Sequence, residues 1–415
     1  MTATLTQFAS SLRAETAFDV LAIAKKLKAA GKDVVELQIG DSPFPTPKHA
    51  KAAGIASIEA GETHYCASPG MPTLREAVAR NYRREYGIEI GPENVIVGSG
   101  AKVFEQFFCE TFLEPGDAVL IFTPHFPTYE PNLHRRGAHA VFSPLRQANQ
   151  FRPDLNDVER FLKSTPRAKA IFLNSPHNPT GGVATAEDLQ GLANLVRGHD
   201  VAVFSDEPYC HMVWQGRHEP LLAQPGIMEQ TVAAYTFSKS YSMSGWRLGY
   251  AVTSPSIAAV FSKLINTSLS CVPPPVQAAG AAALEHDGAE RDEVMGRFHL
   301  KVKLLIDELR KVDGVSVLMP PGTFYAFPNV SAICKRLGIT SHGLALYLLE
   351  GADDKRGVAC LGGECFGAAG QGFLRFSCAE PDDRLRTAVA FFAEAITRTE
   401  RVAKFLAERP KFRLV

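Results

Sequence analysis

The sequence lacks an excess of charge of either sign. Its 415 residues include 44 lysines and arginines against 44 aspartates and glutamates, so the formal net charge at pH 7 is zero. A protein that binds nucleic acid or anionic lipid along an extended surface needs a positive field, which this composition does not supply. Nucleic acids and membranes are therefore not expected among its partners.

Long uncharged apolar runs are also missing. No such stretch reaches the roughly 20 residues that a transmembrane helix needs. The first 13 residues carry Ser, Thr and Gln where a secretory signal would have a basic start and an apolar run. We expect a cytoplasmic protein, in which the 46% hydrophobic residues form a large globular core.

The eight cysteines show no metal-binding or disulfide pattern. They are scattered, never form a Cys-x-x-Cys pair, and mostly have apolar neighbours. This pattern favours buried free thiols over zinc ligands or disulfides. We therefore expect no metal site.

From Asn94 onward, short β-rich apolar runs alternate with longer segments of helical period. This alternation predicts an α/β domain with a mainly parallel sheet. The runs are continuously apolar, which indicates that helices such as 186–197 cover both faces of the sheet. The predicted strands are 95–97, 118–122, 140–142, 170–173, 201–204, 232–237 and 248–252.

A second, smaller unit is predicted after the proline run 273–275, because the charged stretch 291–311 has the pattern of one long helix leading into new material. Its predicted elements are strands 315–318, 323–327 and 373–377 and helices 342–350 and 382–398. We predict a large domain over 48–290, a small α+β domain over 291–415, and an N-terminal segment 1–47 that packs with the small domain.

Polar groups follow four of the predicted strands. Ligands of open parallel sheets bind beyond the carboxyl ends of the strands, so these groups are expected to share one site. Asn178 follows one strand and Asp206 follows the next. A carboxylate at the end of a buried strand requires a cationic or protonated partner. Lys239 follows a third strand, where desolvation would lower the pKa of its amine and make it a nucleophile. The fourth strand leads into the glycine-rich turn 98–102, whose backbone N–H groups can hold a phosphate.

Each feature alone has a structural explanation, as a helix cap, a solvated lysine or a simple turn. Together with Arg247, which lies eight residues after Lys239, they match what a phosphorylated pyridine aldehyde needs. Residues 35–377 resemble the class I, aspartate aminotransferase-like enzymes of pyridoxal-phosphate fold type I, most specifically in the run 239–249. The resemblance implies amino transfer between an L-amino acid and a 2-oxoacid by a ping-pong mechanism.

The resemblance also implies residue roles. Lys239 would hold pyridoxal 5′-phosphate as a Schiff base and then act as general base and acid. Asp206 would pair with the pyridine nitrogen, and Tyr209 and Asn178 would hydrogen-bond the phenolic oxygen. The other implied cofactor-binding residues are Phe126 for ring stacking, and Arg247, Thr236, Ala101, Lys102 and the neighbouring subunit's Tyr65 for the phosphate.

Substrate recognition is assigned in the same way. Arg375 would clamp the substrate α-carboxylate with the help of the Gly40 backbone, and the sharing of Tyr65 implies a homodimer. Lys102 has two interpretations: a solvated lysine in the first turn of a helix, or a cation that binds the distal carboxylate of aspartate or glutamate. The segment 41–43 departs from the family's usual loop, so the side-chain specificity stays open.

Two other functions use related sequences. The same fold supports β-eliminating lyases and other reactions on amino acids, because the carbanion formed on the cofactor can react in several ways. A non-catalytic module of a transcription regulator would need an attached DNA-binding domain, and the balanced charge gives no sign of one.

Overall fold

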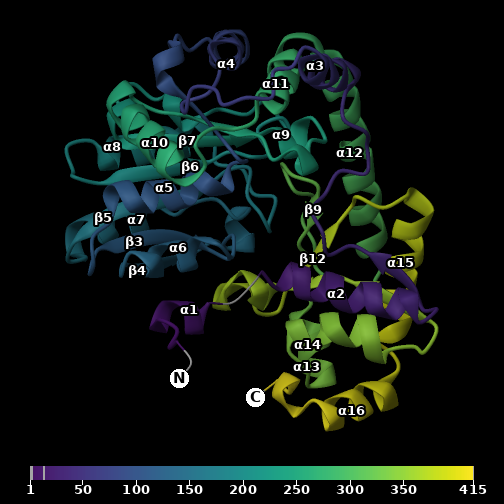
Figure 1. Ribbon diagram of the computed structural model, residues 1–415. Coiled ribbons are helices and arrows are strands. Elements are labelled where there is room, and N and C mark those ends of the chain that lie inside the picture. The colour runs from purple at the N-terminus through teal and green to yellow at the C-terminus, as the bar shows by residue number, and fades with distance from the viewer. Residues whose placement is uncertain (1–2, 13–14, 415) are drawn as a thin grey trace.

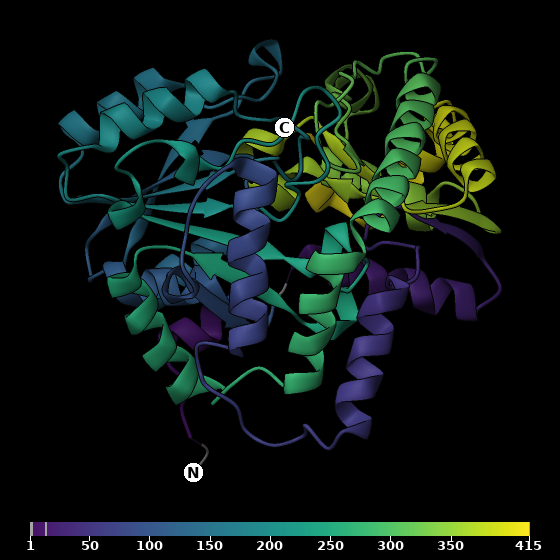
Figure 2. The ribbon, with the colours of Figure 1, turned by 90° about the horizontal axis from the view of Figure 1, so that it is seen from above.

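The computed structural model describes residues 3–12 and 15–414. A sheet-bearing part, coloured blue to teal in Figure 1, lies beside a green-to-yellow C-terminal part, and the purple helix α2 (Thr16–Ala29) lies against the latter. Figure 2 shows the same two parts from above. No helix of the described ranges is long and apolar enough to cross a membrane.

A seven-stranded sheet forms the centre of the first part, in the order β2-β8-β7-β6-β5-β3-β4. β8 runs antiparallel to both of its neighbours, and all other neighbouring strands pair in parallel. The predicted run 232–237 is one residue too long, because β7 ends at Thr236 and Phe237 begins a helix. The strands are β2 (Val95–Gly98), β3 (Ala118–Thr123), β4 (His139–Pro144), β5 (Ala168–Asn174), β6 (Ala202–Asp206), β7 (Thr231–Thr236) and β8 (Gly249–Val252).

Helices cover both faces of this sheet, which confirms the interpretation of the continuous apolar runs. Along β3, Val119 and Ile121 join a buried cluster on one face, and Leu120 and Phe122 join another on the opposite face. The first cluster includes side chains of α5 (Lys102–Phe112), α6 (Tyr129–Arg135) and α10 (Pro255–Ser268). The second includes side chains of α3 (Lys48–Glu59), α4 (Pro72–Tyr86), α7 (Leu155–Ser164), α8 (Ala186–Val196) and α11 (Pro274–His286).

The C-terminal part begins with the long helix α12 (Gly288–Leu309) and contains a three-stranded antiparallel sheet in the order β11-β12-β9. β1, from the N-terminal segment, pairs in parallel with β10. Val35 and Leu37 of that segment lie in the same buried cluster as Phe298 and Ile306 of α12. The remaining elements are α1 (Gln7–Ser11), β1 (Asp33–Glu36), β9 (Tyr325–Ala326), α13 (Ser331–Leu337), α14 (Ser341–Leu346), β10 (Arg356–Ala359), β11 (Leu361–Gly362), β12 (Leu374–Ser377), α15 (Asp382–Ala395) and α16 (Thr399–Glu408).

Three predictions for this part need correction. The strand predicted at 315–318 does not form, because Ser316 makes only an isolated bridge with Asn329. The helix predicted at 342–350 is α14 followed by a π-helical turn, Tyr347–Gly351. The helix predicted at 382–398 ends at Ala395, and α16 follows after a short break. The domain boundaries at 47 and 290 stay predictions.

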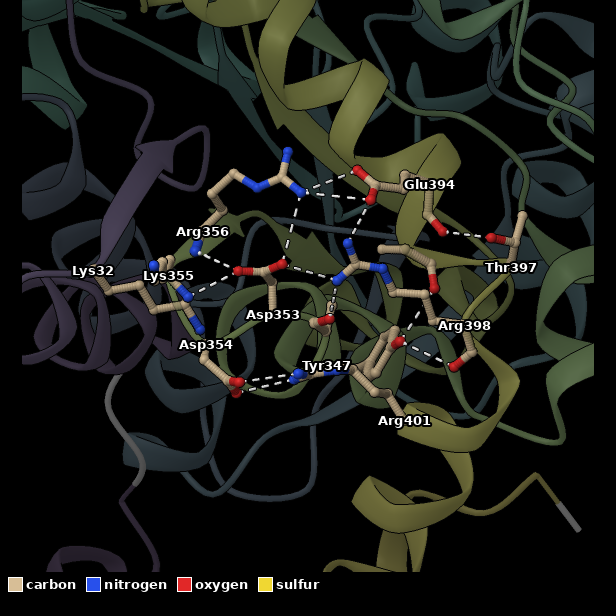
Figure 3. Close-up of polar contacts among 12 residues, drawn as sticks. Lys32, Tyr347, Asp353, Asp354, Lys355, Arg356, Glu394, Thr397, Arg398 and Arg401 are labelled. Carbon is tan, nitrogen blue, oxygen red and sulfur yellow. Dashed lines mark hydrogen bonds and ion pairs between the residues drawn. The ribbon is translucent and has the colours of Figure 1, made fainter.

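Ion pairs gather at the start of β10, and Lys32 of the N-terminal segment lies beside them (Figure 3). Asp353 accepts hydrogen bonds from the Arg356 backbone at 3.0 Å and from the Arg398 guanidinium at 2.9 Å. Partial burial raises the pKa of the Asp353 carboxyl, but the hydrogen bonds outweigh it and hold this pKa well below its usual range. Lys32, directly before β1, donates a 3.1 Å hydrogen bond to the Glu350 carbonyl in the same region. The region around β1 is thus tied to the C-terminal part.

Candidate active site

The carboxyl ends of β5, β6 and β7 open into a cavity of about 550 Å³. The strand register places Asn174 beside Asp206 and Asp206 beside Ala234, so the residues that follow these strands meet at one edge. Both parts of the chain contribute to the lining. It includes every predicted site residue except Tyr65: Gly40, Ala101, Lys102, Phe126, Asn178, Asp206, Tyr209, Thr236, Lys239, Arg247 and Arg375.

Asp206 is the last residue of β6 and is only 5% exposed. The Tyr129 hydroxyl donates a 2.6 Å hydrogen bond to its Oδ2. Burial raises the pKa of the Asp206 carboxyl to about 7, and the hydrogen bond from Tyr129 lowers it only in part. Within the part of the chain that the structure describes, this carboxylate forms no ion pair. A protonated pyridine nitrogen would supply the missing cation.

Lys239 lies on the short helix α9 (Phe237–Ser240), directly after β7. Its Nζ donates a 2.5 Å hydrogen bond to the Gly40 carbonyl and lies 5.9 Å from the centre of the Phe324 ring. A Cβ at Gly40 would lie 1.9 Å from the Tyr325 hydroxyl, so any larger residue would require the buried Tyr325 ring to move. No carboxylate pairs with the ammonium among residues 3–12 and 15–414. In the described structure the amine is therefore held only by the Gly40 carbonyl, and it can contact a ligand in the cavity.

The start of α5 and Arg247 form a site that suits a phosphate. Arg247 has a left-handed backbone (φ 54°), and its guanidinium donates to two backbone carbonyls at 2.9 and 3.2 Å. A Cβ at Gly100 would lie 2.6 Å from Arg247 Nη2, so glycine leaves room for the guanidinium beside the turn. Neither Ala101 N–H nor Lys102 N–H has an acceptor among the described residues. The Thr236 hydroxyl lines the same cavity; it accepts a hydrogen bond from the Ser238 N–H, which caps α9, and donates to Ser238 Oγ at 2.8 Å.

Arg375 on β12 is a buried cation with no counter-anion among the residues that the structure describes. It is 4% exposed, and its guanidinium donates to Asn178 Oδ1 at 2.9 Å and to the Gln38 carbonyl at 2.6 Å. Its Nε is buried with no hydrogen-bond partner in the described part of the chain, and the guanidinium lies over the Tyr325 ring at 4.4 Å. An unpaired buried guanidinium is costly, whereas its fork of donors matches a carboxylate.

Aromatic residues form much of the remaining wall. Tyr209 and Tyr325 lie with their hydroxyl oxygens 3.0 Å apart, and burial raises the pKa of the Tyr209 phenol well above its usual value. Phe126 lies in the lining, where its ring can stack on a planar ligand. Lys102 Nζ lies 5.2 Å from the centre of this ring and pairs with Glu15. Lys102 is therefore a cavity residue, and its ammonium already has an anionic partner.

Tyr65 is the predicted residue that does not join this cavity. It is 88% exposed and lies outside the lining. Its predicted role concerns the cavity of a neighbouring subunit, so it stays a prediction.

The structure also brings residues to the site that the sequence analysis missed. Tyr129 follows Phe126 by three residues, and its closeness to that motif is the one signal that could have indicated it. Tyr325 lies inside a predicted strand and gave no signal of a ligand-facing role. Glu105 lies one helical turn after Lys102 on α5, is 2% exposed, and accepts a 2.5 Å hydrogen bond from Thr128. The spacing of three residues predicts a shared helix face with Lys102.

Comparison with known proteins decides between the functions that such a site allows. Residues 32–392 match the family model described as aminotransferase class I and II. The chain belongs to this aminotransferase family. Aspartate aminotransferase of Pyrococcus horikoshii is 34% identical over 374 residues, which cover 89% of this chain and 90% of that protein. Arginine–pyruvate transaminase of Pseudomonas aeruginosa is 32% identical over 358 residues, covering 86% and 88%.

The fold agrees with this family. The structure of aspartate aminotransferase from Thermus thermophilus with maleate superposes with a TM-score of 0.88 at 31% identity, covering 95% of this chain and 100% of that chain. This aminotransferase therefore has the fold type I architecture that the sequence predicted, and a β-eliminating lyase is not favoured. Because relatives of similar identity are named for aspartate and for arginine, the family does not identify the amino donor.

Proposed function

We propose that this aminotransferase binds pyridoxal 5′-phosphate in the cavity at the end of the central sheet and moves an amino group from an L-amino acid to a 2-oxoacid by a ping-pong route. The observation that carries this proposal is the pair of unmatched charges in one cavity. Within residues 3–12 and 15–414, Asp206 is buried without a cationic partner and Arg375 is buried without an anionic one. Such charges are costly in the empty protein, so they favour a ligand that brings a cation to one and a carboxylate to the other.

Six side chains would hold the cofactor. Asp206 would hold the proton of the pyridine nitrogen, and Phe126 would stack on the ring. Arg247 and the N–H groups at the start of α5 would bind the phosphate, with the Thr236 hydroxyl beside them. Tyr209 would donate to the phenolic oxygen, with Asn178 nearby. When bound, the cofactor supplies an electron sink for the electrons that Cα keeps when it loses its proton.

Arg375 would bind the substrate α-carboxylate through two parallel hydrogen bonds, with the Gly40 N–H at its edge. This clamp fixes the direction in which the Cα–H bond points. Lys239 would take the proton from Cα and return it to the cofactor, because its amine lines the same cavity and would leave the Gly40 carbonyl when a ligand binds. In the second half of the cycle the same residues would bind the 2-oxoacid and move the proton in reverse.

The active unit that we propose is a homodimer, in which Tyr65 of each chain reaches the phosphate of the other. The high exposure of Tyr65 in the single chain supports this role, because large aromatic side chains are usually buried against other protein atoms. The expectation of a cytoplasmic enzyme stays a prediction.

Absorbance spectroscopy tests the proposed function. Addition of a suitable amino acid should shift the absorbance of the cofactor-loaded enzyme, and a 2-oxoacid should reverse the shift. In Lys239→Ala this conversion should slow by roughly a thousandfold or more, since the group that moves the proton is lost. Lys51→Ala, at an exposed position of α3, is the control and should behave as the wild type. Release of ammonia without reversal by any 2-oxoacid would contradict transamination.

A further inference from the structure

The N-terminal segment places a carboxylate at the mouth of the cavity. Glu15 directly precedes α2 and lines the cavity together with Ala17 and Phe18. Its carboxylate accepts a hydrogen bond from Lys102 Nζ, a contact that joins residues 87 positions apart. The side chain of Glu15 is 18% exposed and that of Lys102 is 45% exposed, so the pair lies between the interior of the site and solvent.

This ion pair changes what the cavity offers to a substrate. The cationic side chains in its lining are Lys102, Lys239, Arg247 and Arg375. The proposed function uses Arg375 for the α-carboxylate, Arg247 for the phosphate and Lys239 for proton transfer. Lys102 is the cation left in the described part of the lining for a second carboxylate on the substrate, and Glu15 already neutralises it.

A second acidic residue strengthens this effect. Glu105 lies one turn after Lys102 on the same helix and lines the same cavity. A substrate carboxylate near Lys102 would have to displace Glu15 and would then lie close to two acidic side chains. Burial raises the pKa of the Glu105 carboxyl well above its usual value, and the same desolvation would penalise a substrate carboxylate that entered this end of the cavity. Apolar groups of Ala17, Phe18, Ile39 and Phe126 make up much of the remaining wall.

We propose that the Glu15–Lys102 ion pair excludes acidic side chains and that the amino donors of this enzyme have uncharged side chains. This inference rests on the proposed transamination and specifies its substrate class. Glu15 acts as a specificity-determining residue, because it occupies the cation that would otherwise attract a distal carboxylate. Of the two interpretations of Lys102, the proposal therefore disfavours the one in which it binds the distal carboxylate of aspartate or glutamate.

Aspartate and asparagine form the matched pair of substrates for the test, because they have nearly the same shape and differ in charge. With the cofactor-loaded wild type, kcat/KM should be at least tenfold higher for asparagine than for aspartate. Glu15→Gln should raise the ratio of kcat/KM for aspartate to that for asparagine at least tenfold, because Lys102 becomes free. Lys102→Met added to Glu15→Gln should abolish this gain. Asp19→Asn, which removes a charge from the exposed side of the same helix, should leave the ratio unchanged.

A wild type that prefers aspartate, or a ratio that Glu15→Gln does not change, would overturn the proposal. Calorimetric titration gives a readout that does not need turnover. Maleate carries two carboxylates, whereas crotonate carries one. Glu15→Gln should bind maleate at least tenfold more tightly than the wild type does. The affinity for crotonate should differ less than threefold between the two proteins. If no amino donor reacts, the transamination proposal fails, and equal maleate affinities in the two proteins would separately overturn the role of Glu15.

Discussion

Substitution of Asp206 by Asn should change how the stability of the cofactor-free enzyme depends on pH. Burial raises the pKa of this carboxyl from 3.8 in the unfolded chain to about 7 in the folded protein. Between these two pH values the folded protein keeps a proton that the unfolded chain has released. Since the folded state binds more protons, the free energy of unfolding should fall as the pH rises through this window, and the fall should be complete above pH 7.

The size of the effect follows from the pKa difference. Each unit corresponds to about 1.4 kcal/mol, so the full shift is worth about 4 kcal/mol. Between pH 5 and 7.5 the wild type should lose about 3 kcal/mol of stability through this group, a large share of the total stability of a typical domain. Asp206→Asn stays uncharged at all these pH values and can still accept the hydrogen bond from Tyr129. The variant should therefore lose this pH-dependent component.

Urea unfolding at pH 5, 6 and 7.5 measures the effect in cofactor-free wild type, Asp206→Asn and the control Glu293→Gln, which changes an exposed carboxylate on α12. Other groups titrate in all three proteins, so the difference between the curves isolates Asp206. In the cofactor-loaded enzyme the wild-type slope should shrink, because the pyridine cation would lower the pKa of the carboxyl. Parallel curves for the wild type and Asp206→Asn would refute the view that this carboxyl lacks a cationic partner.

The other predictions concern single contacts of the site. Arg375→Lys keeps the charge but cannot make two parallel hydrogen bonds to a carboxylate, so kcat/KM for the amino-acid half-reaction should fall roughly 30-fold. Arg375→Leu also loses the charge and should lower kcat/KM roughly a thousandfold. Equal losses in the two variants would contradict bidentate binding. Tyr129→Phe removes a hydrogen bond to the Asp206 carboxylate, which should weaken cofactor binding roughly tenfold in a fluorescence titration; unchanged affinity would show that this bond does not serve the cofactor. Tyr65→Phe should weaken cofactor binding by a similar factor although it lies outside its own cavity, and sedimentation should show that the dimer persists; wild-type affinity would argue against a shared site.

Local patterns in the sequence predicted the sheet and much of its functional edge. Asp206 and Lys239 each follow a run of β-forming apolar residues, and such runs show where a strand ends without any knowledge of its neighbours. The β-forming residues of 315–318 misled the prediction, since Ser316 makes only an isolated bridge with Asn329 and no strand forms. Hydrophobic periodicity thus identifies a segment that can pair, whereas the presence of a partner depends on the rest of the fold.

The amino-acid sequence by itself determined the family, the order of the strands along the chain and which polar groups end them, because these properties reside in short contiguous segments. The tertiary structure alone decided which distant groups meet. Tyr129 and Asp206 lie 77 residues apart, Glu15 and Lys102 lie 87 apart, and Asn178 and Arg375 lie 197 apart. No local pattern encodes such contacts, since they depend on strand register and on how the N-terminal segment packs across the end of the sheet. The charge that each of these groups presents to a ligand is consequently a property of the fold.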